Sequence, residues 1–333
     1  MIVTSLSVML APWWTLIGEL SIVKFDYPKC PLPRTIARPY DAVTHSAREG
    51  GMGGSPTVKR RRLSAELVRL RQQAGLTVEE VSQRLEWSTG RLTHMETNKW
   101  VRPDLGNIRA LLDVYGVADR QIRDAIVDLA RQSREKGWWA KYNDVFRGSL
   151  PGFEADATQI RAYEALYIPG LLQTSAYAEA VFRAEQVLDD ETVKRRIEGR
   201  LVRQETLRGE KPPEFWAVID EAACRKLVGG MEVMRDQLRH LIEAAAQPHI
   251  TIQIVPDSVG AHAGMAGSFV LLDFASEQDP SVVYLETATD SLHLEKPGEI
   301  QAYSLIFNRV VAIALSPEES IDYLAALVDR LRE

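Results

Sequence analysis

The sequence predicts a mainly α N-terminal domain of five helices, joined to a C-terminal α+β domain. Three observations support this fold class. Between residue 65 and about residue 136, apolar side chains recur at helical spacing and capping residues separate the segments. Beyond residue 153, helical segments alternate with short runs of β-branched and aromatic residues, which are typical of strands. A length of 333 residues also favours two domains.

Composition divides the chain into four segments. Residues 1–56 form an extension that we expect to be disordered or wrongly included, with Met52 as the true start of the protein. No basic residue precedes its apolar stretch, and Glu19 interrupts that stretch, so we expect neither a secretion signal nor a membrane helix. The remaining segments are a five-helix domain at 57–136, a linker at 137–152 and an α+β domain at 153–333.

The first two helices follow from their end signals. A basic run at 59–62 precedes the first helix, which begins at about residue 65 and ends at Gly75. Thr77 is a suitable N-cap for the second helix, because Glu80 stands three residues later and completes a capping box.

The later elements follow from the same signals. Ser88 caps the third helix, the fourth spans 105–115, and the fifth starts at Asp119. In the second domain, the pattern predicts helices at 156–165, 174–186, 190–208, 230–246, 296–311 and 316–332. It predicts strands at 215–219, 250–255, 268–274, 281–286 and 291–294.

Charge is distributed unevenly along the chain. The net charge is −6, yet residues 57–136 carry +5 and residues 137–333 carry −12. A basic domain attached to an acidic one is typical of a protein that binds a polyanion with one part only. The two cysteines, Cys30 and Cys224, lie far apart, so we expect no disulfide framework, no zinc site and a reducing, cytoplasmic location.

The second and third helices have the pattern of a helix-turn-helix. Val81, Leu85, Leu92 and Met95 occupy the positions that such a pair buries, and Ser82 is the small residue where the helices touch. The second helix of the motif lies in the major groove of DNA, so its outward side chains meet base edges. We therefore predict that base contacts come from Thr89, Gly90, Arg91, Thr93 and His94.

A second set of residues is expected to hold the DNA backbone. Arg91 has the donors for a bidentate contact to guanine, or it contacts a phosphate instead. Phosphate contacts are also expected at the basic run, at the starts of the second and third helices, and around the end of the third. These residues are Lys59, Arg60, Arg61, Arg62, Thr77, Ser88, Asn98 and Lys99.

The segment LVRLRQQAGLTVEEVSQRLEWSTGRLTHMETNKWVRP, residues 67–103, resembles the xenobiotic-response-element family of helix-turn-helix regulators, in the superfamily of the phage repressors. The shared features are the Leu-Thr before the second helix, the Ser that opens the third, its Met-Glu-Thr-Asn-Lys close and the Pro before the fourth. The resemblance implies a phage-repressor-like fold and a homodimer on double-stranded DNA. Two positions depart from the family: Glu86 stands in the turn where Gly is usual, and Val78 stands where Gln is common. A left-handed backbone at Glu86 would cost about 1 kcal/mol, so we expect an adjusted turn.

The second domain shows no catalytic motif, so we expect no enzyme activity, no cofactor and no metal. Its histidines, at 240, 249, 262 and 293, are scattered. His262 lies in a glycine-flanked loop and is the best candidate for a ligand contact. Asp220 and Glu221 follow a strand and are expected to cap the next helix.

Several strings in this domain, above all ALYIPGLLQTSAY at 165–177, resemble the large C-terminal domain of antitoxin-like actinomycete regulators. This resemblance implies autoregulation and binding of a small acidic protein encoded next to the regulator. Residues 168–172 form either a structural turn that buries Leu171 and Leu172 or a surface for that partner. The sequence thus predicts a sequence-specific DNA-binding transcriptional regulator. The alternative is a ligand-sensing repressor with a small-molecule pocket near His262.

Overall fold

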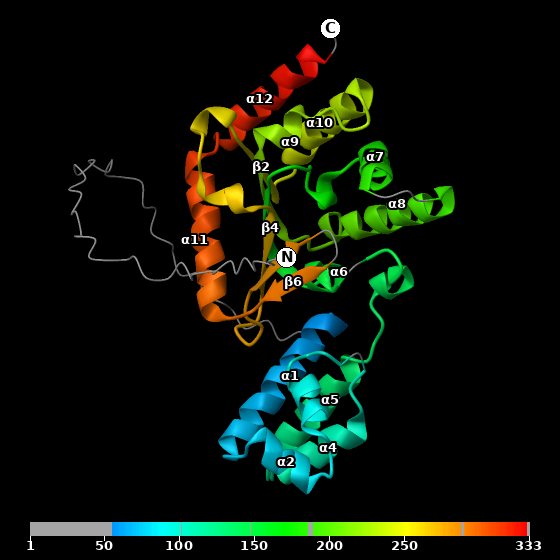
Figure 1. The fold of residues 1–333 in the computed structure, drawn as a ribbon, viewed down its shortest axis with the longest axis vertical. Helices are drawn as coiled ribbons and strands as arrows, with labels where there is room; N and C mark the ends of the chain where they lie inside the picture. Colours follow the sequence, from blue (N-terminus) through cyan, green and yellow to red (C-terminus); the bar gives the residue numbers. More distant parts are fainter. Residues whose placement is uncertain (1–54, 101, 147, 186–188, 288–289, 332–333) are drawn as a thin grey trace, which may run out of the picture. The chain divides into compact units, whose positions relative to one another are not determined.

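The computed structural model describes residues 55–100, 102–146, 148–185, 189–287 and 290–331 (Figure 1). The predictions of a disordered extension and of a start at Met52 concern residues outside these ranges. Ser55 and Pro56, which the predicted boundary assigned to the extension, instead begin the first helix as its N-cap and first residue.

The N-terminal domain has five α-helices in the predicted order. They are α1 (Pro56–Gln73), α2 (Val78–Arg84), α3 (Thr89–Glu96), α4 (Leu105–Val114) and α5 (Arg120–Gln132). Leu67, Leu92, Ile108 and Leu111 are fully buried at the centre of the bundle. The helix α1 is longer than predicted: the Ser55 cap and Pro56, whose ring suits the first helical position, bring the basic run 59–62 inside the helix.

The helix α1 belongs to two hydrophobic cores. Its C-terminal half buries Leu63, Leu67 and Leu70 in the bundle, whereas Val58 packs into the core of the C-terminal domain. The Ser55 hydroxyl donates a hydrogen bond to the carbonyl oxygen of Gly152 at 2.5 Å. The start of α1 is therefore part of the C-terminal domain, and its end is part of the bundle.

The segment predicted as a linker contains two short helices, η1 (Trp138–Tyr142) and α6 (Leu150–Glu154). Leu150 and Phe153 are buried in the core of the C-terminal domain. Trp138 packs edge to face against Trp139 and Phe146, and Tyr142 packs edge to face against Phe146. Much of this segment is thus folded structure.

The C-terminal domain contains a mixed six-stranded sheet in the order β3-β2-β1-β4-β5-β6. The strands β1, β2 and β3 are parallel, and β4, β5 and β6 are added in antiparallel fashion. The bounds are β1 (Ala157–Glu164), β2 (Glu214–Asp220), β3 (Ile250–Val255), β4 (Phe269–Phe274), β5 (Val282–Glu286) and β6 (Ser291–Leu294).

Helices cover both faces of this sheet. One face holds the larger core, where Ile160, Ala217 and Ile252 meet side chains such as Leu238 and Leu324 from the helices. The other face packs Val218 and Leu271 against Phe307 of α11, which runs along that side of the sheet in Figure 1. The helices are α7 (Ser175–Glu185), α8 (Asp190–Gln204), α9 (Glu221–Arg225), α10 (Met231–Ala245), α11 (Pro297–Ile313) and α12 (Pro317–Arg330).

One predicted element of this domain was wrong. Residues 156–165 were expected to form a helix, but β1 occupies them at the centre of the sheet. Alternate residues face opposite cores: Ile160 and Ala162 join the larger core, whereas Tyr163 joins the other. Ladder hydrogen bonds to β2 and β4 on both sides outweigh the moderate helix propensity of this stretch.

Candidate nucleic-acid interface

The helices α2 and α3 form the helix-turn-helix, and side-chain caps define where each begins. The Thr77 hydroxyl accepts from the Glu80 amide at 3.2 Å, and the Glu80 carboxylate accepts from the Thr77 amide at 2.8 Å, which completes the predicted capping box. The Ser88 hydroxyl accepts from the Arg91 amide and caps α3. Val81 and Ser82 are buried where α2 faces α3.

The turn between these helices keeps its left-handed residue. Glu86 has a φ of 55°, so the expected adjustment of the turn is absent. The Trp87 amide donates to the carbonyl oxygen of Ser82 at 2.9 Å and closes the turn. Packing of the two helices therefore imposes a conformation that Glu86 would not prefer by itself.

The helix α3 has one buried side and one exposed side. Leu92 and Met95 are buried in the bundle. The residues predicted to contact bases all lie on the exposed side: Thr89, Gly90, Arg91, Thr93 and His94. A Cβ atom at Gly90 would meet no atom within 4 Å, so nothing in the bundle requires glycine there.

Arg91 has a fixed stacking partner on this surface. Its guanidinium carbon lies 4.2 Å from the centre of the Trp87 ring, a cation–π contact. The stacking restricts the rotamers of a long side chain while its donors still face solvent. Arg91 is therefore positioned to donate to DNA at a reduced entropic cost.

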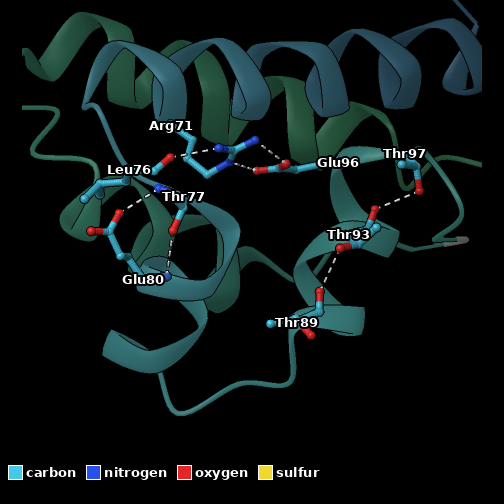
Figure 2. Close-up of polar contacts among 8 residues, drawn as sticks. All are labelled: Arg71, Leu76, Thr77, Glu80, Thr89, Thr93, Glu96 and Thr97. Atoms are coloured by element: carbon cyan, nitrogen blue, oxygen red, sulfur yellow. Dashed lines mark hydrogen bonds and ion pairs between the residues drawn. The ribbon is translucent and has the colours of Figure 1, made fainter.

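The threonines of α3 use their hydroxyl hydrogens within the helix. Thr93 Oγ1 donates to the carbonyl oxygen of Thr89 at 2.9 Å, and Thr97 Oγ1 donates to that of Thr93 at 2.7 Å (Figure 2). In this state the Thr93 hydroxyl offers an incoming ligand only its acceptor lone pairs. Arg91 and His94 are thus the principal side-chain donors of the exposed face.

A buried ion pair fixes the end of α3 to α1. Arg71 donates to both carboxylate oxygens of Glu96, at 2.7 and 3.0 Å, and to the carbonyl oxygen of Leu76 at 2.8 Å (Figure 2). The hydrogen bonds that Arg71 donates to the Glu96 carboxylate raise the pKa of its guanidinium. No local sequence pattern indicates this ion pair, because its two residues meet only when the bundle closes.

The start of α2 is a poor site for the predicted phosphate contact at Thr77. The Glu80 carboxylate already accepts from the Thr77 amide, and Glu79 adds a second negative charge in the first turn. These hydrogen bonds lower the pKa of Glu80, so it is ionised at neutral pH. An anion therefore occupies the position that a DNA phosphate would take.

The basic run on α1 needs a correction. The Arg61 side chain is buried and donates to the Glu295 carboxylate at 2.8 Å, and Arg62 lies 4.0 Å from Asp279. Partial burial lowers the pKa of Arg60. The predicted phosphate contact at Arg61 is therefore wrong for this conformation, and the run serves instead to attach α1 to the C-terminal domain.

The remaining predicted phosphate residues surround α3. Ser88 and Lys99 are exposed at its two ends. Asn98 has a φ of 54° and ends the helix in the left-handed conformation, while the Lys99 amide donates to the carbonyl oxygen of His94 at 2.9 Å. The Lys99 side chain, rather than its amide, is the group available to a phosphate.

In the second domain, residues 168–174 form a structural turn. Leu171 and Leu172 are buried, as one of the two interpretations required. Amide side chains hold this turn in place: Gln204 donates to the carbonyl oxygens of Gly170 and Gln173, and Gln237 donates to that of Leu172 at 2.7 Å. Side chains of α8 and α10 thus bind the backbone of residues 168–174.

His262 faces inward rather than into an open loop. Its side chain is 8% exposed, and Nε2 lies 3.4 Å from a carboxylate oxygen of Asp220. Nδ1 accepts from the Gly264 amide at 3.2 Å. The other oxygen of Asp220 accepts from the Ala222 amide and caps α9, as predicted. These contacts give His262 a structural role.

The bundle, with α3 exposed on its surface, defines a helix-turn-helix protein of the DNA-binding class. Residues 62–125 match a family model described as a helix-turn-helix domain. Residues 148–326 match a model described as a domain of unknown function (DUF5753), which covers more than half of the chain. The chain therefore belongs to the DUF5753 family. Neither the curated proteins nor the solved structures contain a match to it.

Two further findings bear on other classes of site. Among the described residues, no group of three or more His, Cys, Asp or Glu side chains could hold a metal ion. No single described helix is both long and apolar enough to cross a membrane, although the pair α11 and α12, bent by 66°, passes that test by length and composition.

Proposed function

We propose that this protein is a sequence-specific transcriptional regulator of the xenobiotic-response-element type, which binds double-stranded DNA as a homodimer in the cytoplasm. The exposed face of α3 carries the proposal. Arg91 is stacked on the Trp87 ring and His94 is exposed on the same helix, while the opposite face is fixed by Leu92, Met95 and the Arg71–Glu96 pair. A rigid helix with outward donors is what insertion into the major groove requires.

Charge supports the same proposal. The helix-turn-helix domain is positive and the remainder of the chain is strongly negative. This asymmetry would direct the bundle, and not the C-terminal domain, towards the duplex. With Arg61 and Arg62 engaged elsewhere, we expect fewer phosphate contacts than the sequence predicted.

The test is a gel-shift titration of the full chain on DNA from upstream of its own gene, at several salt concentrations. We expect log affinity to fall linearly with log salt, at about −0.9 for each phosphate neutralised. Binding that is independent of salt, or absent from every duplex at low ionic strength, would contradict the proposal. Sedimentation with and without a palindromic site would test the homodimer.

The C-terminal domain is proposed to receive a small acidic partner protein, in an autoregulatory, antitoxin-like arrangement without enzyme activity. Support comes from the resemblance of 165–177 and neighbouring strings to such regulators. The test takes the protein encoded by a short acidic reading frame beside the gene. This protein would be co-purified with the chain and tested for its effect on the gel shift. Failure of the two proteins to associate would remove the partner but leave the DNA-binding proposal intact.

A further inference from the structure

The C-terminal domain contains a cavity of ≈ 510 Å³ beside its larger core. Cavities of this size are typical of small-molecule sites in proteins. The cavity lies between the end of α8, continued by the short helix η3 (Glu205–Leu207), and the end of α10. Its apolar lining consists mainly of Leu171, Leu172, Leu207 and Ile250, all of which are buried core residues.

The backbone carbonyl groups around the cavity already have partners. The Leu207 carbonyl oxygen accepts a hydrogen bond from His249 Nε2 at 2.9 Å. The carbonyl oxygens of Glu243 and Ala244, at the end of α10, accept from amide groups three residues later in the chain. These helix ends therefore offer no unused carbonyl group to a ligand.

The ionisable side chains on the wall favour neither sign of charge. Arg208 and Glu243 carry opposite charges, and both are exposed to solvent. Arg208 is also paired with Glu205 at 2.9 Å. Burial lowers the pKa of His240, so this ring is neutral at pH 7. A charged ligand would lose hydration on entering this cavity without meeting a buried counter-charge.

Gln204 supplies a polar group with an unused acceptor. This residue is 4% exposed, and its amide nitrogen donates to the carbonyl oxygens of Gly170, at 3.1 Å, and Gln173, at 2.7 Å. These bonds use both hydrogens of the amide and fix its orientation. Within the described ranges, Gln204 Oε1 accepts no hydrogen bond, and it is not among the fully enclosed polar atoms. Since Gln204 lines the cavity, this oxygen is a preoriented acceptor for a ligand.

We propose that this cavity binds a small neutral organic molecule with an apolar body and a hydroxyl group. The aliphatic lining takes the body, and the hydroxyl group donates to Gln204 Oε1. Leu171 and Leu172 belong to the turn at 168–174 that Gln204 also holds, so the ligand would stabilise this turn. The inference does not depend on DNA binding, and it gives the DUF5753 domain a ligand of its own.

Four compounds of similar size test the proposal. They are 4-phenylbutan-1-ol, its isomer 3-phenylpropyl methyl ether, which lacks a donor, 4-phenylbutylamine and 4-phenylbutyrate. Each is titrated into the full-length protein by calorimetry at pH 7.

We expect the alcohol to bind most tightly and the ether about fivefold more weakly, because one hydrogen bond is lost. Both ions should bind more weakly than the alcohol, because they lose hydration. An ion that binds as tightly as the alcohol, equal binding of the alcohol and the ether, or no binding of the alcohol up to its solubility limit would overturn the proposal.

Three variants locate the site. Gln204→Met removes the acceptor and should abolish the preference for the alcohol over the ether. Ala244→Leu adds volume on the cavity wall and should weaken both compounds by about tenfold or more. Ala302→Leu, the same change at an exposed position of α11, should leave both affinities unchanged.

Unfolding curves establish that each variant is folded, and Ala244→Leu still decides the location if Gln204→Met does not fold. A preference for the alcohol that survives in folded Gln204→Met would contradict the role of Gln204. Alcohol binding that is unchanged in Ala244→Leu would contradict the location of the site.

Discussion

Individual side chains on α3 differ in how much freedom they have to contact DNA. The Thr93 hydroxyl is committed to its own helix, and Gly90 has no side chain. Arg91, stacked on Trp87, keeps its donors exposed. A residue type and its spacing are visible in the sequence, but the partner that restrains it is not. The importance of Arg91 was predicted from its position, and the stacking that prepares it was not.

Arg91→Ala is the first substitution to make. We expect it to weaken binding to the cognate site by about 1–3 kcal/mol, because a base or phosphate contact and its preorganisation are lost. Arg195→Ala is the matched control, since Arg195 is an arginine of α8 that pairs with Asp144 at 2.6 Å. Gel shifts at one salt concentration compare them, and equal losses would contradict the assignment of the interface.

Gly90→Ala separates stability from recognition. The backbone φ of Gly90 is not positive and the added Cβ has open space, so we expect α3 to be stabilised by roughly 0.5 kcal/mol. The same methyl group would project into the groove and alter the affinity for DNA. Thermal unfolding and gel shifts measure the two effects, and a stable variant with unchanged affinity would place Gly90 outside the contact.

At the scale of elements, the caps and periodicities predicted the helices of the bundle, five of the six strands and the longer helices of the C-terminal domain, but not its short helices such as α6 and α9. The errors lie where tertiary contacts decide. The start of α1 was missed because Ser55 is held by Gly152, which is 97 residues away. The strand β1 was taken for a helix because its alternation is visible only once two cores are known. The pair Arg71–Glu96 had no local signal at all.

Glu96→Gln tests the Arg71–Glu96 ion pair that fixes α3. The side chains of Arg71 and Glu96 are 13% and 7% exposed, so the variant leaves a buried guanidinium without its counter-charge. We expect a loss of about 3 kcal/mol in the free energy of unfolding. Glu66→Gln breaks the exposed pair with Arg69 and should change the free energy of unfolding by less than about 1 kcal/mol. Urea unfolding compares the two variants. Equal losses of stability would show that the Arg71–Glu96 pair contributes no more than an exposed ion pair.

At the scale of the whole molecule, pH should affect stability through Glu164, at the end of β1. Burial, opposed by a hydrogen bond from Ser268, raises its pKa to about 7. Between pH 4.5 and 7 the unfolded chain has lost this proton while the folded protein retains it. The contribution of Glu164 to stability therefore falls as the pH rises through this window, by at most about 1.4 kcal/mol per pH unit.

Glu164→Gln cannot titrate and should remove this dependence. The difference in the free energy of unfolding between the variant and the parent protein should increase from pH 5 to pH 7. Above pH 8 this difference should change little. Urea unfolding at several pH values gives the difference between the two proteins. A difference that is the same at every pH would show that Glu164 does not hold its proton in the folded state.

The attachment of α1 to both cores should couple the two domains. Arg61 donates to Glu295 at 2.8 Å beside the buried Val58. A double-mutant cycle with Arg61→Met and Glu295→Gln should give a coupling energy of about 1 kcal/mol. The exposed pair Arg120–Asp124 on α5 is the control, with a coupling near zero. A null result for both pairs would mean that this ion pair does not link α1 to the C-terminal domain.

The sequence by itself determined the helix-turn-helix, the exposed face of α3, the mixed α and β content of the second domain and the uneven charge, because caps, periodicity and composition are local properties. Only the tertiary structure decided that Arg61 is buried, that His262 faces inward and that a cavity opens between α8 and α10. Burial and partnership depend on residues that are distant in the chain, and packing alone brings them together.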